Sequence, residues 1–307
     1  MSRLALYDRV AEETSSGVIR RYSTSFGLAS RLLGSGVRQH VENIYALVRV
    51  ADEIVDGPAA EAGLAGDGEA RILDGLEAEV ERAIDCGFSA NLIVHAFART
   101  ARATGFGSEL TRPFFASMRD DLSATVHDQE SFDTYVYGSA EVVGLMCLRA
   151  FLAVECGGPG LVASHYDEPT RDRFERGACA LGAAFQKVNF LRDLHDDFET
   201  LGRSYFPGVD PSSFSDAERD RLVADIDADL RLAGSVIPQL PASSRRAVAL
   251  AHGLFAELNR RLAVTPASEL MVSRIRVPNP VKLRIAAASA AGHVTPIGAG
   301  DRSGAPA

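Results

Sequence analysis

One helical segment carries two aspartates that could bind a cation. In IYALVRVADEIVDG, Tyr45, Arg49, Asp52 and Asp56 recur every three or four residues and therefore share one helix face. Like charges at this spacing destabilise an isolated helix by a few tenths of a kcal/mol, so the aspartate pair needs water or a cation beside it. A pair of this kind on its own is explained equally well by a solvated helix end.

A second segment strengthens the case for a cation. In GAAFQKVNFLRDLHDDF, large apolar residues occupy one side of the predicted helix. The other side carries oxygen-bearing groups: Gln186, Asn189, Asp193, Asp196 and Asp197. The spacing leaves open whether Asp196 or Asp197 completes the set, because these two residues flank the stripe. Facing each other across a helical bundle, the two segments would form a site for a hard cation.

Carboxylate and amide oxygens without histidine or cysteine suit magnesium, which often binds through one or two carboxylates together with substrate phosphates. Two clusters indicate several ions that clamp a diphosphate and make it a better leaving group. A di-iron bundle would need paired Glu-x-x-His motifs, which the sequence lacks.

Composition narrows the remaining function classes. The net charge of -9 argues against a sequence-independent grip on nucleic acid. The four cysteines show no metal-binding spacing and are expected to be reduced thiols of a cytoplasmic protein. The N-terminus interrupts any apolar run with acidic residues, so we expect no signal peptide. No stretch reaches the ~20 apolar residues of a membrane span, and we expect a soluble or membrane-peripheral protein.

Helical periodicity extends over most of the chain and alternating strand patterns are scarce, which predicts an all-α bundle of about ten helices. No linker divides residues 1–290, so we predict a single large helical domain there. Residues 291–307 are rich in Gly, Pro and Ala and are predicted to be a disordered tail.

From Tyr22 to Ala290 the sequence resembles the squalene and phytoene synthase family, and bacterial phytoene synthases in particular. The resemblance is specific because five motifs occur in combination. These are YSTSF at 22–26, RVADEIVDGP at 49–58, YVYGSAEVVGLM at 135–146, QKVNFLRDLHDDFETLGRSYFP at 186–207 and RIRVPNPVKL at 274–283.

The resemblance implies an isoprenoid synthase fold with a central cavity, two to three magnesium ions, and manganese as a substitute. It implies metal ligands at Asp52, Asp56, Asn189, Asp193 and Asp197, and thus favours Asp197 over Asp196. It implies catalytic roles for these aspartates, Gln186 and Tyr135. Substrate contacts are implied for Ser23, Ser25, Phe26, Tyr45, Arg49, Lys187, Arg192, Arg203, Tyr205 and Arg276.

Three positions depart from the family pattern. Tyr22 stands where many relatives have a histidine, and Glu141 stands where they have a small residue. Glu53 follows Asp52 in a motif that reads DEIVD, which leaves its role as a ligand open. These departures concern substrate contacts more than the metal chemistry.

The implied reaction joins two geranylgeranyl diphosphates head to head, through a cyclopropylcarbinyl diphosphate, to phytoene. The alternative is a C30 enzyme that uses farnesyl diphosphate to make dehydrosqualene or, with NADPH, squalene. A terpene cyclase is disfavoured because its second metal motif is absent, and a non-catalytic helical assembly protein because both acidic clusters are present. We expect about half of the following residues to line the cavity: Phe26, Tyr135, Val142, Val143, Leu145 and Met146. Release of an apolar product suggests a peripheral membrane contact; the sequence leaves the oligomeric state open.

Overall fold

The computed structural model describes residues 2–64, 67–123, 126–201 and 204–294, without the side chains of residues 196, 197 and 199–201. Within these residues the fold is all-α, as predicted, and β-pairing is limited to one isolated bridge between Val126 and Ser204. The expected ten or so helices are supplemented by short ones, because several connections are themselves helical.

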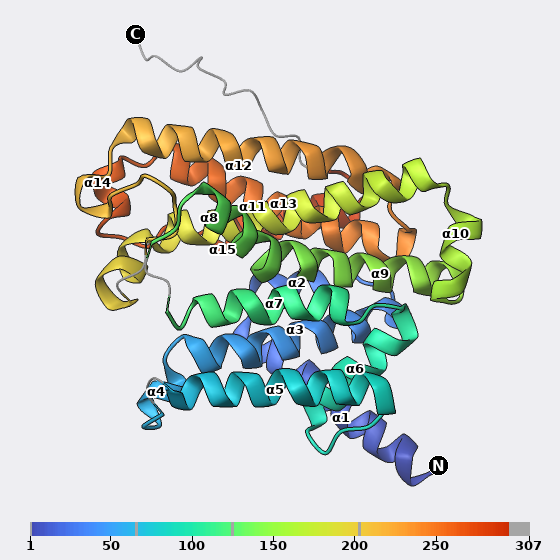
Figure 1. Cartoon of the computed structure of the whole chain (residues 1–307). Helices are drawn as coiled ribbons and strands as arrows, with labels where there is room; N and C mark the ends of the chain where they lie inside the picture. Colours follow the sequence, from blue (N-terminus) through green and yellow to red (C-terminus); the bar gives the residue numbers. More distant parts are fainter. Residues whose placement is uncertain (1, 65–66, 124–125, 202–203, 295–307) are drawn as a thin grey trace.

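The N-terminal half forms the lower rows of helices in Figure 1 and the helices that border the centre of the molecule. They are α1 (Arg3–Tyr22), α2 (Ser25–Ser30), α3 (Ser35–Val55), α4 (Pro58–Glu61), α5 (Asp67–Cys86), α6 (Leu92–Thr104), α7 (Ser108–Asp120), α8 (Gln129–Val136), the π-helix η1 (Tyr137–Glu141) and α9 (Val142–Cys156).

The C-terminal half covers this set from above (Figure 1). Its elements are η2 (Pro159–Leu161), α10 (Val162–His165), α11 (Glu168–Leu201), η3 (Pro211–Ser213), α12 (Asp216–Val236), η4 (Ile237–Gln239), α13 (Ala242–Val264), α14 (Ala267–Leu270) and α15 (Asn279–Ala290). Helix α11 has 34 residues and runs from beside α10 to the opposite edge of the molecule.

Local sequence sets the helix ends. The Asn91 side chain accepts hydrogen bonds from the backbone N–H groups of Ile93 and Val94, which begins α6. Gly105, with φ of 76°, ends it in the left-handed conformation that glycine adopts without steric cost. Ser215 and Glu218 form a reciprocal capping box at the start of α12.

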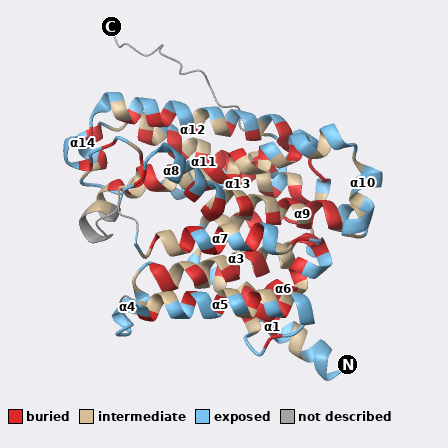
Figure 2. Ribbon diagram, in the orientation of Figure 1, coloured by how far each residue is buried: buried red, intermediate tan, exposed pale blue. Residues whose placement is uncertain are grey.

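Burial follows the stacking of the helices. Figure 2 shows buried residues on the facing sides of α3, α9, α11 and α13, and exposed residues on the outer faces of α5 and α12. One core cluster joins α3, α5, α6, α7 and α9, and another joins α11, α12 and α13. The two halves therefore meet along α9 and α11.

Glycines allow the backbones of α9, η1 and α11 to approach closely. A Cβ at Gly144 would lie 2.6 Å from the Ala178 carbonyl oxygen, and a Cβ at Gly182 would lie 2.5 Å from the Ala140 carbonyl oxygen. Real Cβ atoms do not occupy such positions, so a side chain at either glycine would force the helices apart. This contact closes one side of the space between the two halves.

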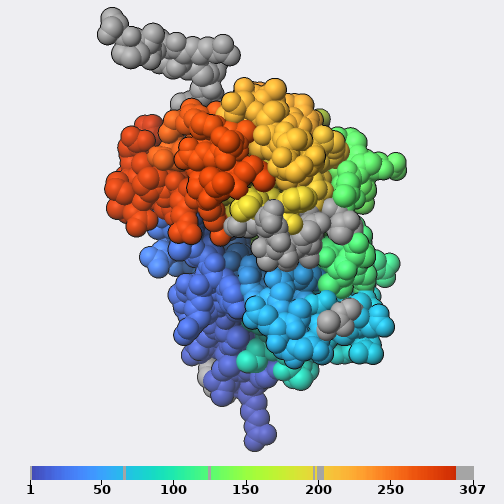
Figure 3. All heavy atoms as spheres, turned by 90° about the vertical axis from the view of Figure 1, so that its left-hand side faces the viewer, coloured from blue at the N-terminus to red at the C-terminus, as the bar shows by residue number. Residues whose placement is uncertain are grey.

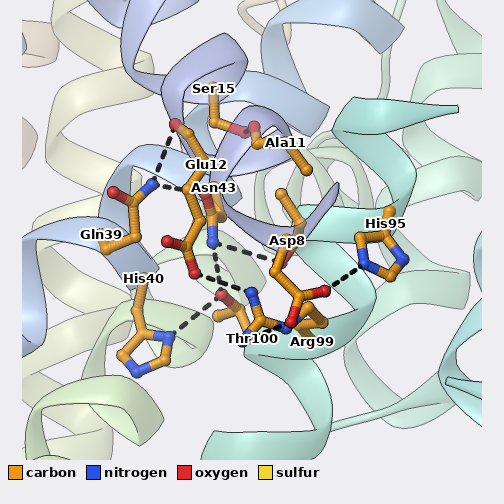
Figure 4. A network of polar contacts seen from close by, with 11 residues as sticks. Asp8, Ala11, Glu12, Ser15, Gln39, His40, Asn43, His95, Arg99 and Thr100 are labelled. Carbon is orange, nitrogen blue, oxygen red and sulfur yellow. Dashed lines mark hydrogen bonds and ion pairs between the residues drawn. The ribbon is translucent and has the colours of Figure 1, made fainter. Parts of the chain in front are cut away.

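A polar network anchors α1 to α3 and α6 (Figure 4). Buried Asn43 donates hydrogen bonds to the Ala96 carbonyl at 3.2 Å and to the Thr100 hydroxyl at 3.0 Å. Asp8 on α1 accepts a hydrogen bond from His95 at 2.9 Å and pairs with Arg99 at 3.5 Å. The Asp8 contacts hold α1 against α6, and the Asn43 contacts hold α3 against α6.

Helix α15 ends at Ala290, where the helical domain was predicted to end. The single domain and the disordered tail stay predictions, and residues 295–307 of that tail lie outside the described part of the chain. None of the described helices combines the length and apolar character needed to cross a membrane.

Candidate active site

A cavity of about 660 Å³ lies between the two halves and is lined by α3, α7, α9, α11 and α13. Its lining is charged where α3 and α11 end and apolar where α11 begins. The C-terminal ends of α3 and α11 lie on the left side of Figure 1, which is the side turned toward the viewer in Figure 3. The two segments that the sequence predicted to face each other thus border one cavity.

Helix α3 forms the first polar wall. Tyr45, Arg49, Asp52 and Asp56 all line the cavity, as their common spacing predicted. Burial and the neighbouring Asp56 raise the pKa of Asp52 to about 7, against the attraction of Arg49. The Asp52 side chain keeps 30% of its surface exposed, so solvent and ions can reach it.

Arg49 contacts two of the residues that depart from the family pattern, Glu53 and Tyr22. Its guanidinium pairs with Glu53 and lies 3.9 Å from Asp52. It also lies over the Tyr22 ring, 4.8 Å from the centroid, in a cation–π contact. Glu53 does not line the cavity, so its carboxylate stabilises the Arg49 guanidinium from outside the cavity.

Helix α11 forms the second wall with Gln186, Asn189, Arg192 and Asp193. Arg192 donates a hydrogen bond through Nε to the Asp193 Oδ1 atom at 2.8 Å. Arg274, from the segment after α14, reaches the same Oδ1 atom at 2.9 Å. Two guanidinium groups thus balance one carboxylate at the charged end of the cavity.

A buried cluster of hydroxyl groups and one carboxylate lies beside these walls. Tyr135 donates a hydrogen bond to Asp121 at 2.9 Å, and Tyr205 donates to the same carboxylate at 3.0 Å. Burial, followed by the charge of Asp121, raises the pKa of Tyr135 well above its usual value, so the phenol stays protonated. The charge of Asp121 also contributes to the raised pKa of Asp52.

Several predicted substrate contacts are not brought into the cavity. Lys187, which was predicted to contact the substrate, does not line the cavity, because one helix position after Gln186 turns its side chain by about 100°. It pairs with Asp225 at 2.6 Å and with Asp229 at 2.9 Å on α12.

Three further predicted contacts do not line the cavity: Ser23, Ser25 and Arg276. The Ser23 hydroxyl accepts a hydrogen bond from the Phe26 N–H at 3.0 Å and also hydrogen-bonds with Tyr45. Ser23 therefore positions two lining residues. Arg203 and the side chains of Asp196 and Asp197 lie outside the described residues, so their predicted roles stay predictions.

Sequence reasoning missed Asp121 and Arg274. Asp121 follows Phe114 and Met118 at helical spacing, so the sequence places a carboxylate on an apolar helix face. A carboxylate in such a position needs a polar partner, and this could have indicated a site residue. Arg274 and Arg276 lie in a non-helical segment, where no periodicity could indicate which of the two faces the cavity.

The apolar lining agrees with the expectation that about half of the candidates face the cavity. Phe26, Tyr135 and Val143 line it, whereas Val142, Leu145 and Met146 pack into or against the N-terminal core cluster. Phe26 packs against Phe185 at 5.6 Å and Phe255 at 5.7 Å between ring centroids. The Phe26 and Phe185 rings give the cavity an aromatic wall next to its charged end, and Phe255 packs behind them.

The donors at the charged end fit a hard cation, because they are carboxylate and amide oxygens on two walls of one cavity: Asp52, Asp56, Asn189 and Asp193. Among the side chains that the structure describes, no three His, Cys, Asp or Glu groups lie close enough to hold an ion on their own. A cation bound here would share its coordination with a ligand between the walls.

The family model described as squalene/phytoene synthase matches residues 19–280 of the chain. The chain belongs to the squalene/phytoene synthase family. Among its relatives, the 15-cis-phytoene synthase of a Paracoccus species is 32% identical over 200 residues, which is 64% of this chain and 59% of that enzyme. The 15-cis-phytoene synthase of Enterobacter agglomerans is 27% identical over 294 residues, 89% of this chain and 92% of that enzyme.

The matched region thus spans less than two thirds of the Paracoccus relative's length. Among solved structures, a dehydrosqualene synthase superposes with a TM-score of 0.72 at 19% identity and covers 93% of this chain and 97% of its own. This family member has the isoprenoid synthase fold that the sequence predicted.

Proposed function

We propose that this family member is a phytoene synthase, a prenyltransferase that joins two geranylgeranyl diphosphates head to head through a cyclopropylcarbinyl diphosphate. The overall reaction releases two diphosphates and two protons. One observation carries the proposal: the two oxygen-rich walls and the apolar chamber belong to the same cavity. A charged entrance with an apolar interior fits a substrate with a diphosphate head and a long hydrocarbon tail.

The polar residues divide the work of binding the head group. We assign Asp52, Asp56, Asn189, Asp193 and, by family resemblance, Asp197 as the ligands of two to three magnesium ions. Bound magnesium, or manganese in its place, would neutralise the leaving diphosphate. Arg49, Arg192 and Arg274 line the same end and supply fixed positive charge to the diphosphate oxygens.

The interior residues shield the reacting carbons from water. Gln186 lies one helical turn deeper than Asn189, between the polar end and the aromatic wall of Phe26 and Phe185. Tyr135 and Tyr205 are tied to Asp121, so their rings are fixed at the boundary between the two regions. A fixed, water-poor boundary keeps cationic intermediates from premature hydrolysis.

The decisive experiment incubates the protein with magnesium and geranylgeranyl diphosphate and identifies the hydrocarbon product. Phytoene should form, and NADPH should leave the product unchanged. The Asp52→Asn variant serves as the matched control, because it keeps the shape of the side chain and removes its charge. Absence of product with every prenyl diphosphate would refute the proposal and favour the non-catalytic alternative.

The C30 alternative makes a different prediction in the same assay. Dehydrosqualene from farnesyl diphosphate, or squalene that appears only with NADPH, would overturn the choice of substrate and product. The assignment of the polar end would stand in that case, because both reactions begin with loss of diphosphate.

We further propose that the protein acts in the cytoplasm and contacts the inner face of the membrane, where an apolar product can leave. Three strongly exposed apolar side chains lie on the C-terminal helices and their connection: Val264, Val272 and Leu283. Arg276, Lys282 and Arg284 occur in the same part of the chain and could meet anionic head groups. Flotation with anionic and with neutral vesicles tests the contact; flotation with neither would refute it.

A further inference from the structure

We propose that Phe174 determines the length of the prenyl chain, because it closes the apolar end of the cavity at a depth that fits a C20 tail. The inference deepens the proposed function and rests on it. It names a residue that selects the substrate without touching the reacting atoms.

A single stripe of α11 runs from the polar end of the cavity to Phe174. Asn189, Gln186, Gly182, Ala178 and Phe174 are separated by three or four residues, so they share one helix face. All five line the same cavity. The rise per residue of α11 therefore gives the depth of the cavity from Asn189 to Phe174.

Phe174 forms the floor at the end of this stripe. Its side chain is 1% exposed and belongs to a core cluster with Leu148, Val236 and Leu240, which also line the cavity. The Tyr166 ring packs against it edge-on, with centroids 5.4 Å apart and an interplanar angle of 76°. Because Tyr166 packs against it, the Phe174 ring has little freedom to move when a ligand contacts it.

The depth of the floor separates a C20 chain from a C15 chain. Gln186 and Phe174 are twelve residues apart, which corresponds to about 18 Å along the helix axis. With carbon–carbon bonds of about 1.5 Å, an extended zigzag gains about 1.25 Å per bond, so a C20 prenyl tail spans about 19 Å and a C15 tail about 14 Å. A C20 tail that starts beside Gln186 reaches the floor, whereas a C15 tail leaves its last part empty.

The residues between the two ends leave room for the chain. Gly177, Ala178 and Gly182 are the small members of the α11 lining, and Gly144 lies opposite them on α9. On this stripe the first bulky side chain below Gln186 is that of Phe174, and Leu181 lines the cavity beside the stripe. We therefore place the selection of prenyl chain length at Phe174.

Shortening the floor residue should admit longer substrates. We expect Phe174→Ala to raise kcat/KM for a C25 prenyl diphosphate relative to the C20 substrate by at least about tenfold, since one methylene alone discriminates about 10-fold or more in a fitted pocket. Phe174→Leu should shift the same ratio in the same direction by a smaller factor. The measurement is competition between C15, C20 and C25 diphosphates, with the hydrocarbons identified by mass.

A substitution higher in the stripe should act in the opposite direction. Ala178 lies eight residues from Gln186, about 12 Å along the axis, so a larger side chain there would obstruct a C20 tail more than a C15 tail. We expect Ala178→Leu to lower the C20-to-C15 ratio by at least about tenfold.

Phe97→Leu is the matched control, because Phe97 is fully buried in the N-terminal core and does not line the cavity. It should leave all chain-length ratios unchanged. If the wild type is active and the Phe174 and Ala178 variants fold but keep its ratios, the inference is refuted and the proposed function stands. If the wild type releases diphosphate from no prenyl substrate, the proposed function itself fails.

Discussion

Arg274 Nε lies 2.9 Å from Asp193 Oδ1, which ties the segment after α14 to the end of α11 across the charged end of the cavity. Arg192 donates to the same oxygen at 2.8 Å. Asp193 is therefore held in place by cations that a diphosphate would also attract. The carboxylate and its arginines form one functional unit.

We expect Asp193→Asn to reduce product formation by about 10²-fold or more. The variant loses a ligand of the magnesium ions that would neutralise the departing diphosphate. The helical circular dichroism spectrum should stay unchanged, since the amide keeps the size of the side chain. A correctly folded variant with near-normal turnover would contradict the role of this wall.

Arg274→Ala should raise KM by about tenfold, whereas Arg276→Ala should change it little. Of these two neighbouring arginines, only Arg274 lines the cavity and contacts Asp193, so they form a matched pair. Steady-state kinetics with geranylgeranyl diphosphate decide between them. Equal effects would indicate that general surface charge, not a specific contact, attracts the substrate.

Asp121→Asn should destabilise the protein by about 1–3 kcal/mol, because an amide cannot satisfy two buried tyrosine hydroxyl donors as a carboxylate does. Chemical denaturation measures this loss. Tyr205→Phe, which removes one donor and keeps the ring, should cost less. A larger cost for Tyr205→Phe would mean that the carboxylate is not the centre of the cluster.

Magnesium should bind more tightly as the pH rises from about 6 to 8. Burial and Asp56 raise the pKa of Asp52 to about 7, so protons compete with the cation for this carboxylate in that range. Titration calorimetry in buffers of different ionisation enthalpy should show proton release on binding. Asp52→Asn should remove this pH dependence; an unchanged dependence would assign it to another group.

Burial of His40, where α3 contacts Thr100 of α6, should make stability fall as the pH drops below 6.5. His40 Nδ1 lies 3.0 Å from the Thr100 hydroxyl, which also accepts a hydrogen bond from Asn43. Burial and the nearby Arg99 lower the pKa of His40 from 6.5. The unfolded chain then binds the proton more readily and gains stability in acid.

His40→Gln tests this contribution. The free energy of unfolding of the variant should fall less steeply than that of the wild type between pH 6.5 and 5. Buried His127 and His252, whose pKa values are also lowered, act equally in both proteins. Identical slopes would show that His40 does not contribute.

The sequence predicted most of the polar site because the relevant side chains repeat along helices. Asp52 and Asp193 could be assigned to faces from spacing alone, and both line the cavity. Resemblance to a motif does not specify which face of a helix a residue occupies, and Lys187 pairs with α12 instead of lining the cavity. The place of Arg274 depends on the tertiary packing of a non-helical segment, which no local pattern encodes. The spacing of Asp121 from Phe114 and Met118 was visible in the sequence, but its contacts with Tyr135 and Tyr205 depend on tertiary packing.

The depth of the cavity could not be predicted for a related reason. Phe174 reads as one more apolar residue of an amphipathic helix, and only its packing beside Leu148 and Leu240 makes it a floor. The all-α fold needed far less information, since periodicity over the whole chain was sufficient.

The close approach at Gly144 and Gly182 limits how this cavity can change in evolution. Any new side chain at these positions would separate α9 from α11 and disturb both halves of the protein at once. Single substitutions that remodel the chamber are therefore confined to other positions, such as Phe174 on α11, Val41 on α3 and Val248 on α13. Descendants with altered products should keep both glycines and diversify at those positions.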